Sequence, residues 1–358
     1  FASNLCFSDI AMTYLGYAGL ALALSILALW LEGCDFDDDD EVETPKRLGS
    51  YLVIGDWGWD ANVHGNLNTR RCQQLVANAM HEQFEALGDV NFVVNVGDSF
   101  YPDGVSSKDD LQWDLKWRQV YSTKVRSVPW YSIYGNHDYH ADPCACSDDV
   151  KSCAQVNDDI TDLGYFYMPD ASWYREHPEL NLEVIGLDLN YYTWVNSTCR
   201  HTACPDTCHE RLKKRSDDAL QLFAERIRKS TANNWLVFSH YPSDYFPGGW
   251  NESIPLHWWS PSWLHLSAAE RPAMLMNFLP ELSNASRASI VYFGGHRHNV
   301  DQRSVKSISP HTSWLSGGGG GWGVDGEQQG FVVGEIMEDG QVKTYPVLVD
   351  YADCTGDS

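Results

Sequence analysis

Basic residues are scarce in this chain. Its 358 residues include 25 Lys and Arg against 49 Asp and Glu, a formal net charge of -24 at pH 7. Proteins that bind nucleic acid present a basic stripe or patch to the phosphates, and this sequence has none. We therefore expect no nucleic-acid partner. An anionic substrate would also need a local source of attraction, because the protein as a whole repels it.

Internal repeats and long low-complexity segments are absent as well. Hydrophobic residues make up 43% of the chain, which has 15 Trp, so a disordered chain is excluded. The longest glycine run, Gly317–Gly321, is too short for a linker. Because it lies between strand-like segments, it predicts a tight turn beside a site.

One segment lacks charge altogether. Ile10–Leu31 has no charged residue and is long enough, at about 1.5 Å per helical residue, to cross a bilayer. We expect residues 1–32 to be a single N-terminal transmembrane anchor. The alternative is a signal peptide, whose apolar core is usually shorter, about 7–15 residues. Gly19 and Ala23 have the spacing of small residues in packed membrane helices, which is compatible with a transmembrane-helix partner in a larger membrane complex.

The flanks of this segment suggest its orientation. Residues 33–47 are predicted to be an acidic linker, and such a flank suits the non-cytoplasmic side. Three sequons point the same way, with glycosylation candidates at Asn196, Asn251 and Asn284. We expect a single-pass membrane protein with its main domain on the lumenal or extracellular side, in the secretory pathway, at the cell surface or in an acidic organelle.

The 10 cysteines agree with that compartment. Several cluster in segments 143–153 and 198–209, and the second cluster also fits a metal knuckle. Disulfides in a secretory lumen are the favoured interpretation. The eight cysteines from Cys72 onward permit about 105 pairings, so none is predicted.

Residues 48–352 have the pattern of one α/β domain. Helical spacing runs from Cys72 to Leu87, where Gly88 is placed to end the helix, and again over Leu220–Lys229. Strand-like segments are expected at 51–54, 91–96, 130–134, 182–189, 235–239 and 290–295, with a hairpin at 330–337 and 342–350.

Nearly every predicted strand is followed by a glycine or small residue and then a side chain that can bind metal. These side chains are Asp56, Asp98, Asn136, His240 and His296. Ligands bind in α/β sheets at the crevice beyond the strand carboxyl ends, where glycine lets the backbone come close. Each residue alone would more often be a turn or capping residue, but five such strand ends in one chain favour a site.

The ligand types indicate the class of metal. Carboxylates, an amide oxygen and imidazoles, without thiolate, suit fairly hard cations in near-octahedral sites. His296 and His298 are two residues apart on what we expect to be an extended segment, so they can give one imidazole to each of two adjacent ions. Asp98 is the natural bridge between those ions, because a carboxylate can bind both.

In order, these motifs resemble those of the calcineurin-like metallophosphoesterases: "GDWG", "GDSFY", "GNHD", "SHYP" and "GHRH". Tyrosine three residues after the bridging aspartate is the mark of the purple acid phosphatases, and the spacing looks most like the small tartrate-resistant acid phosphatases. The resemblance covers roughly Tyr51–Asp350 and implies a four-layer α/β/β/α sandwich.

The resemblance also implies a dinuclear centre. One Fe(III) would take Asp56, Asp98, Tyr101 and His298. A second divalent metal (Fe, Zn or Mn) would take Asp98, Asn136, His240 and His296. Eight metal–protein bonds in two octahedral sites leave about four positions for water, hydroxide and phosphate.

The expected activity is therefore that of a membrane-anchored acid phosphatase. A metal-bound hydroxide would attack a small phosphate monoester or a phosphoprotein, and His137 is the candidate acid for the leaving group. Asp138 would either orient His137 or stabilise the turn. Trp59 departs from the close relatives, which usually have glycine there, and this departure narrows the expected pocket mouth.

Two other functions remain open. The first is a phosphodiesterase or nucleotide pyrophosphatase on the same fold, against which Tyr101 counts. The second is a non-catalytic subunit of a membrane complex that retains the fold and metals. Catalysis is favoured because all the ligands and His137 are present.

Overall fold

The chain divides into two compact units, residues 1–44 and 45–358. The structure is a computed structural model that describes only residues of the second unit: 45–62, 66–141, 144, 146, 149–191, 199, 202–243, 289–305, 307, 311–323 and 325–355. The expected anchor, most of the linker and the three sequons lie outside these residues. Among the described residues, no helix has both the length and the hydropathy needed to span a membrane.

The first of two six-stranded sheets has the order β12-β11-β1-β2-β3-β4. Its strands are β1 (Arg47–Ile54), β2 (Val90–Asn95), β3 (Trp130–Ser132), β4 (Phe166–Tyr167), β11 (Gly330–Met337) and β12 (Val342–Leu348). Strands β1 to β4 are parallel, and β11 pairs antiparallel with both β1 and β12. The predicted hairpin is thus confirmed, and it extends the sheet that the first strand begins.

The second sheet has the order β5-β6-β7-β8-β10-β9. Its strands are β5 (Trp173–His177), β6 (Leu182–Leu187), β7 (Asn234–Ser239), β8 (Ser289–Gly294), β9 (Val300–Asp301) and β10 (Thr312–Ser316). Strands β6, β7, β8 and β10 are parallel, and β5 and β9 are antiparallel edges. The predicted strands in this part of the chain are confirmed, whereas β5, β9 and β10 were not predicted.

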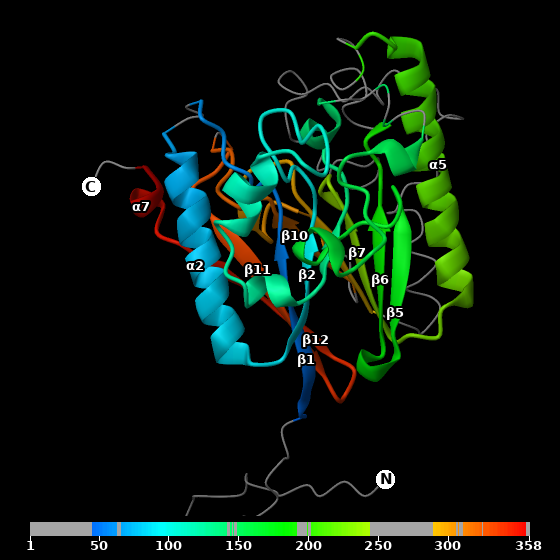
Figure 1. Cartoon of the computed structure of the whole chain (residues 1–358). Helices are drawn as coiled ribbons and strands as arrows, with labels where there is room; N and C mark the ends of the chain where they lie inside the picture. Colours follow the sequence, from blue (N-terminus) through cyan, green and yellow to red (C-terminus); the bar gives the residue numbers. More distant parts are fainter. Residues whose placement is uncertain are drawn as a thin grey trace, which may run out of the picture. The chain divides into compact units, whose positions relative to one another are not determined.

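The sheets pack face to face between two long helices, α2 (Thr69–Leu87) and α5 (Pro205–Lys229) (Figure 1). Side chains of both sheets meet in the middle: Tyr51, Val53, Phe92 and Val94 from the first, and Leu236, Phe238, Val291 and Phe293 from the second. Strands buried on both faces read as continuous apolar runs, as these do. The fold is therefore a two-sheet α/β sandwich.

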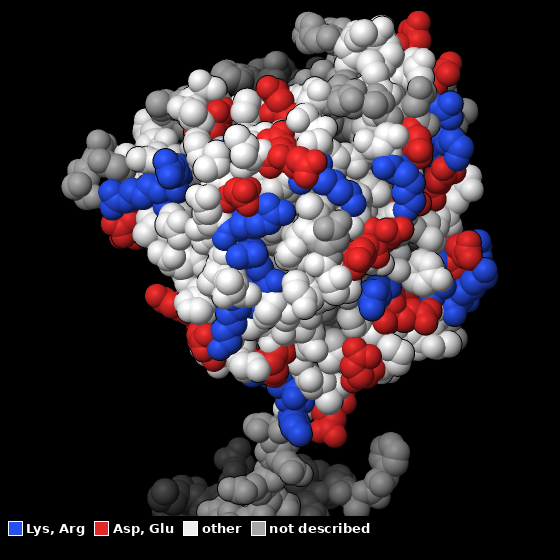
Figure 2. Space-filling model, viewed as in Figure 1, with Lys and Arg blue, Asp and Glu red and all other residues white. Residues whose placement is uncertain are grey.

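Both long helices follow from their sequences. α2 begins at the N-cap Asn68, whose side chain accepts from the Arg71 backbone N–H, and ends at Gly88, which adopts a left-handed φ of 73°. α5 begins at Pro205 rather than at Leu220, because Pro is tolerated in the first helical turn. Its exposed face carries i to i+4 ion pairs such as Lys213–Asp217, and Figure 2 shows both signs of charge interspersed along this edge.

The eight cysteines from Cys72 onward form four disulfides. Disulfides rather than a metal site were the favoured interpretation of these cysteines. The pairs are Cys72–Cys354, Cys144–Cys204, Cys146–Cys153 and Cys199–Cys208. The second cysteine cluster is thus not a metal knuckle. The first pair fastens the short C-terminal helix α7 (Tyr351–Thr355) to α2.

Candidate metal centre

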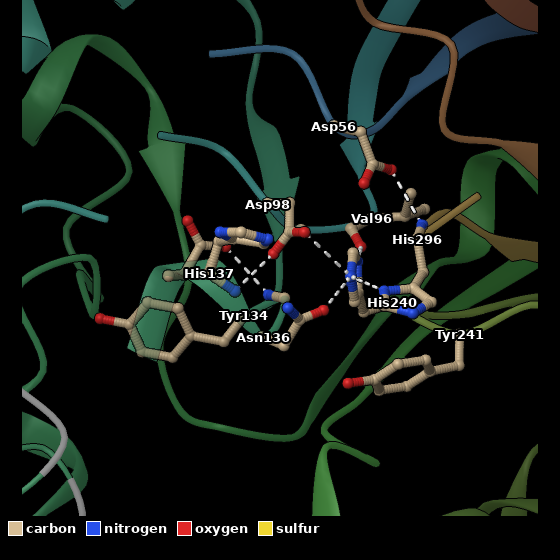
Figure 3. Close-up of polar contacts among 12 residues, drawn as sticks. Asp56, Val96, Asp98, Tyr134, Asn136, His137, His240, Tyr241 and His296 are labelled. Carbon is tan, nitrogen blue, oxygen red and sulfur yellow. Dashed lines mark hydrogen bonds and ion pairs between the residues drawn. The ribbon is translucent and has the colours of Figure 1, made fainter. Parts of the chain in front are cut away.

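The candidate ligands all follow the carboxyl ends of parallel strands, where the two sheets meet. Asp56, Asp98 and Asn136 follow β1, β2 and β3 of the first sheet, and His240 and His296 follow β7 and β8 of the second. Figure 3 shows that side chains from both sheets point toward one another. The site thus lies at the crevice that such sheets use for ligands.

Three of these residues have left-handed backbone conformations, which side chains other than glycine seldom adopt. The φ angles are 56° at Asp56, 49° at Asp98 and 70° at His296. Each such residue costs about 1–3 kcal/mol, and such strain clusters at functional sites. Here it turns the chain sharply at the strand end, so that each side chain faces the crevice.

Four donors converge around Asp98. His240 Nε2 lies 3.3 Å from Asp98 Oδ2, 3.1 Å from Asn136 Oδ1 and 3.3 Å from His296 Nδ1 (Figure 3). The ligand atoms of Asp98, His240 and His296 all lie within 4.8 Å of one another. The other ring nitrogen, His240 Nδ1, lies 3.0 Å from the Val96 carbonyl oxygen, so Nε2 is the atom presented to the group.

A second set of donors lies around Asp56 and Asp98. The Tyr101 hydroxyl donates to Asp56 Oδ1 (2.8 Å) and Asp98 Oδ2 (3.2 Å). His298 Nε2 lies 3.7 Å from Asp56 Oδ1. The seven predicted ligands therefore fall into two groups that share Asp98.

The prediction that His296 and His298 lie on an extended segment is wrong. The segment bends at His296, whose backbone N–H donates to Asp56 Oδ2 (3.0 Å). One ring lies beside His240 and the other beside Asp56. The bend, rather than a strand-like alternation, thus sends the two imidazoles to different groups.

Glycine is required where backbone approaches the carboxylates. A Cβ on Gly135 would lie 2.1 Å from Asp98 Oδ1, and one on Gly317 would lie 2.6 Å from Asp56 Oδ2. The run Gly317–Gly321 continues along the turn after β1, where the Gly319 backbone N–H donates to the Gly55 carbonyl (3.0 Å). The tight turn predicted beside a site therefore packs directly on Asp56.

Burial and close charges shift the protonation of these groups. Burial would lower the pKa of His240, yet Asp98 raises it to about 9. Burial favours the neutral form of Asp98, but the facing imidazoles, His240 foremost, hold its pKa well below the ordinary value. Burial together with the charge of His240 lowers the pKa of His296 far below its usual range. Burial also raises the pKa of Asp56 to about 6.

Tyr101 is fully buried and contacts two carboxylates. Burial, assisted by the charges of Asp56 and Asp98, raises the pKa of its phenol well above 10. The phenol can give up its proton beside two carboxylates only if a cation replaces that proton. Oxygen and imidazole donors without thiolate fit hard or borderline cations, so the residues present suit a metal pair.

His137 and Asp138 lie next to this centre. The His137 backbone N–H donates to Asp98 Oδ1 (2.8 Å), and its Nδ1 lies 2.5 Å from the Pro102 carbonyl oxygen. Burial lowers the pKa of His137. The Asp138 carboxylate accepts hydrogen bonds from the backbone N–H groups of Ser99 and Gly135 (both 2.9 Å), which favours a turn-stabilising role.

Sequence reasoning missed two residues of the site. Asp325 Oδ2 lies 2.7 Å from His298 Nδ1, the ring nitrogen that does not face Asp56. The Trp322 ring lies 4.8 Å from the ring of Tyr101 and 5.0 Å from that of His137. Their position just after the glycine run was the available signal, because that run was already expected beside a site.

The sequence is similar to those of known proteins. Residues 49–300 match the calcineurin-like phosphoesterase family. Purple acid phosphatase 3 of Arabidopsis thaliana is 27% identical over 355 residues, covering 94% of this chain and 83% of that protein. The tartrate-resistant acid phosphatase type 5 of Oryctolagus cuniculus is 31% identical over 121 residues, which are 34% of this chain and 33% of that one.

A solved structure shares the fold. GAP50, described as the anchor in the inner membrane complex of Plasmodium, superposes with a TM-score of 0.50 at 19% identity, covering 84% of this chain and 89% of that one. At this identity the likeness concerns the fold alone. Because the family match spans most of the chain, the protein belongs to the calcineurin-like phosphoesterases, with relatives among the purple and tartrate-resistant acid phosphatases.

Proposed function

We propose that this protein is a membrane-anchored purple acid phosphatase that hydrolyses phosphate monoesters at an Fe(III)–M(II) centre. One observation carries the proposal: the Tyr101 hydroxyl lies between Asp56 and Asp98, at 2.8 and 3.2 Å. A phenolate is a hard, anionic donor suited to Fe(III). A site for two divalent ions of a phosphodiesterase has no need of a phenol at this point.

Two sets of residues would hold the metals. Fe(III) would be held by Asp56, Asp98, Tyr101 and His298, and the divalent ion by Asp98, Asn136, His240 and His296. When bound, such a pair lowers the pKa of water and neutralises the charge on phosphate oxygens. The backbone N–H of His137 on Asp98 Oδ1 keeps the shared carboxylate in place between the two groups.

His137 is assigned the proton transfer to the leaving group. Its Nδ1 donates to the Pro102 carbonyl, so the exchange of a proton with substrate falls to Nε2. The hydrogen bond fixes the ring, and the Trp322 ring lies 5.0 Å from it. A small phosphate monoester or a phosphorylated side chain is the substrate class that this acid serves.

Attachment and location complete the proposal. The uncharged run Ile10–Leu31 supports a single N-terminal anchor, and four disulfides support a lumenal or extracellular domain. Sensitivity of the full chain to an N-glycosidase tests this orientation. An unglycosylated chain whose domain is digested from the cytoplasmic side would contradict it.

A non-catalytic subunit of a membrane complex is the second candidate. The apolar run Ile10–Leu31 also supports this candidate, because the run is compatible with a transmembrane-helix partner. The retention of all seven candidate ligands and His137 favours the enzyme. The likeness to GAP50, which is an anchor by its description, shows the fold alone.

The test uses the full chain, produced in a eukaryotic secretory host and purified in detergent. We expect a purple absorption band, about two metal ions per chain with iron among them, and phosphomonoesterase activity at acidic pH. Tyr101→Phe should lose the band. A colourless protein with two zinc or manganese ions would contradict the iron site and favour the phosphodiesterase alternative, and an inactive chain would favour the non-catalytic subunit.

A further inference from the structure

A buried lysine, Lys116, contacts the backbone of the candidate iron ligand Tyr101. Lys116 belongs to η1 (Trp113–Arg118), a single turn of π-helix, and is only 5% exposed. A buried ammonium is unfavourable unless its hydrogens are bonded, so the contacts of Lys116 show what it serves.

Those contacts lead to Tyr101. Lys116 Nζ donates to the Tyr101 carbonyl oxygen and to Gln112 Oε1 (2.7 Å). The Tyr101 backbone N–H donates to the Gly58 carbonyl (3.1 Å). Both peptide groups that flank the Tyr101 side chain are therefore held, and the phenol leaves a fixed backbone toward Asp56.

The next peptide unit along the chain holds His137. The residue after Tyr101 is Pro102, whose carbonyl accepts from His137 Nδ1. Displacement of the backbone at Tyr101 would therefore move the phenol and the hydrogen bond that orients His137 together. Lys116 is positioned to support a metal donor and the candidate acid at once.

Trp59 covers this lysine. Lys116 Nζ lies 5.0 Å from the centre of the Trp59 ring, a cation–π distance. Gln73 of α2, which is fully buried, joins the two residues: its Oε1 accepts from the Trp59 backbone N–H (3.3 Å) and its Nε2 donates to the Lys116 carbonyl (2.8 Å). A glycine at position 59 would leave the ammonium without this ring.

We propose that Lys116, covered by Trp59, is a positioning residue of the metal centre. Through the Tyr101 carbonyl it sets the phenol against the iron position, and through Pro102 it sets the ring of His137. This inference rests on the proposed function, since it takes Tyr101 as an iron ligand. The inference gives Trp59 the role of covering the Lys116 ammonium, in addition to the narrowing of the pocket mouth expected from the sequence.

The test compares variants of the full chain loaded with metal. Lys116→Met keeps the apolar stem and removes the donors, whereas Lys116→Arg keeps a cationic donor. We expect Lys116→Met to shift the visible band, to lower iron affinity roughly 10–100-fold, as for lost outer-shell contacts, and to reduce kcat more than KM. Lys116→Arg should recover part of each. Lys124→Met, at an exposed lysine paired with Glu85, is the matched control and should change none of them.

An unchanged band, iron affinity and kcat in Lys116→Met would overturn the inference, even if stability fell. If that variant does not fold, Trp59→Leu decides, because it removes the ring over the Lys116 ammonium and leaves the lysine itself unchanged. A shift of the visible band relative to wild type supports the inference, and an unshifted band overturns it.

A colourless wild-type protein would instead contradict the proposed function. In that case, the amount of zinc retained in the presence of a chelator tests the role of Lys116 separately from the proposed iron site. Weaker retention in Lys116→Met supports a positioning role at the metal centre, and equal retention overturns it.

Discussion

Asp325 lies directly behind His298, with Oδ2 2.7 Å from Nδ1, while Nε2 of the same ring faces Asp56 at 3.7 Å. A carboxylate on the far nitrogen fixes the tautomer and orientation of a metal-binding histidine and raises its basicity. The charge of His298 in turn helps to hold the pKa of Asp325 below its ordinary value, although burial opposes this. This pair extends the candidate metal centre beyond its ligands.

Asp325→Asn should therefore weaken metal binding at His298. The amide removes the negative charge that faces Nδ1, and loss of such a partner typically costs roughly 10–100-fold in metal affinity. Metal content after dialysis against a graded series of chelator concentrations measures the change. Asp218→Asn, at a carboxylate paired with Lys214 on α5, serves as the control. Equal retention by Asp325→Asn and wild type would show that Asp325 does not support the ligand.

Gly135→Ala should damage the site through Asp98. The new Cβ would lie 2.1 Å from Asp98 Oδ1 and 2.4 Å from its backbone nitrogen, so the shared carboxylate must move. Displacement of a catalytic group by about 1 Å can cost about 100-fold in rate. Assays of kcat with metal analysis test this. Gly340→Ala is the control, because its φ of 84° makes alanine strained by about 1–2 kcal/mol while no atom lies within 4 Å of the new Cβ. Wild-type activity in Gly135→Ala would contradict the expectation.

A buried ion pair joins α5 to the second sheet. Arg226 Nε lies 2.6 Å from Glu183 Oε1, and the two side chains are 7% and 1% exposed. Arg226→Met would leave the Glu183 carboxylate uncompensated, and we expect a loss of about 3–5 kcal/mol in the free energy of unfolding. Urea unfolding measures it.

The double variant Arg226→Met with Glu183→Leu separates charge from packing. It removes both charges, so most of the lost stability should return. If the double variant were as unstable as Arg226→Met alone, the loss would come from packing of the arginine stem rather than from the unpaired carboxylate.

Removal of the Cys72–Cys354 disulfide, as the double alanine variant, should destabilise the domain without emptying the site. The bond spans 282 residues, and loss of a native disulfide typically costs about 2–5 kcal/mol, more for longer loops in the chain-entropy account. Cys199–Cys208, which spans 9 residues, offers the matched comparison and should matter less. Denaturant unfolding and metal content are the readouts. A larger effect at the short loop would contradict this ranking.

Much of the fold was predictable because its strands are short apolar runs with glycine after them. The six separate strands, the final hairpin and the glycine end of α2 all follow from local pattern. β10 (Thr312–Ser316) could not be predicted, since "TSWLS" mixes small polar and apolar residues and gains its strand conformation from pairing with β8. The start of α5 was also missed, because "CHERLKKRSDD" has few apolar residues to mark a helical face.

For the site, chain order and residue type were enough to select residues that the fold brings together. The candidate ligands could be recognised locally, because they lie at or shortly after the ends of strands. Asp325 and Lys116 carry no such signal. Asp325 meets His298 only because the glycine run turns back over Asp56, and Lys116 meets Tyr101 only because an irregular helical turn buries it. The prediction of an extended segment at His296 was wrong because it, too, depends on a contact distant in sequence. A hydrogen bond from the His296 backbone N–H to Asp56 stabilises the bend there.

The pairing of β1 with β11 has a consequence for biosynthesis. Strand β1 lies between β2, which follows soon after it, and β11, which ends at Met337 near the end of the chain. The turn that carries Asp56 is likewise covered by the Gly317–Gly321 run. A ribosome must therefore deliver almost the entire domain before the first ligand has its final surroundings. We expect metal uptake to follow completion of this domain, so that the supply of metal in the folding compartment, rather than the rate of translation, limits maturation.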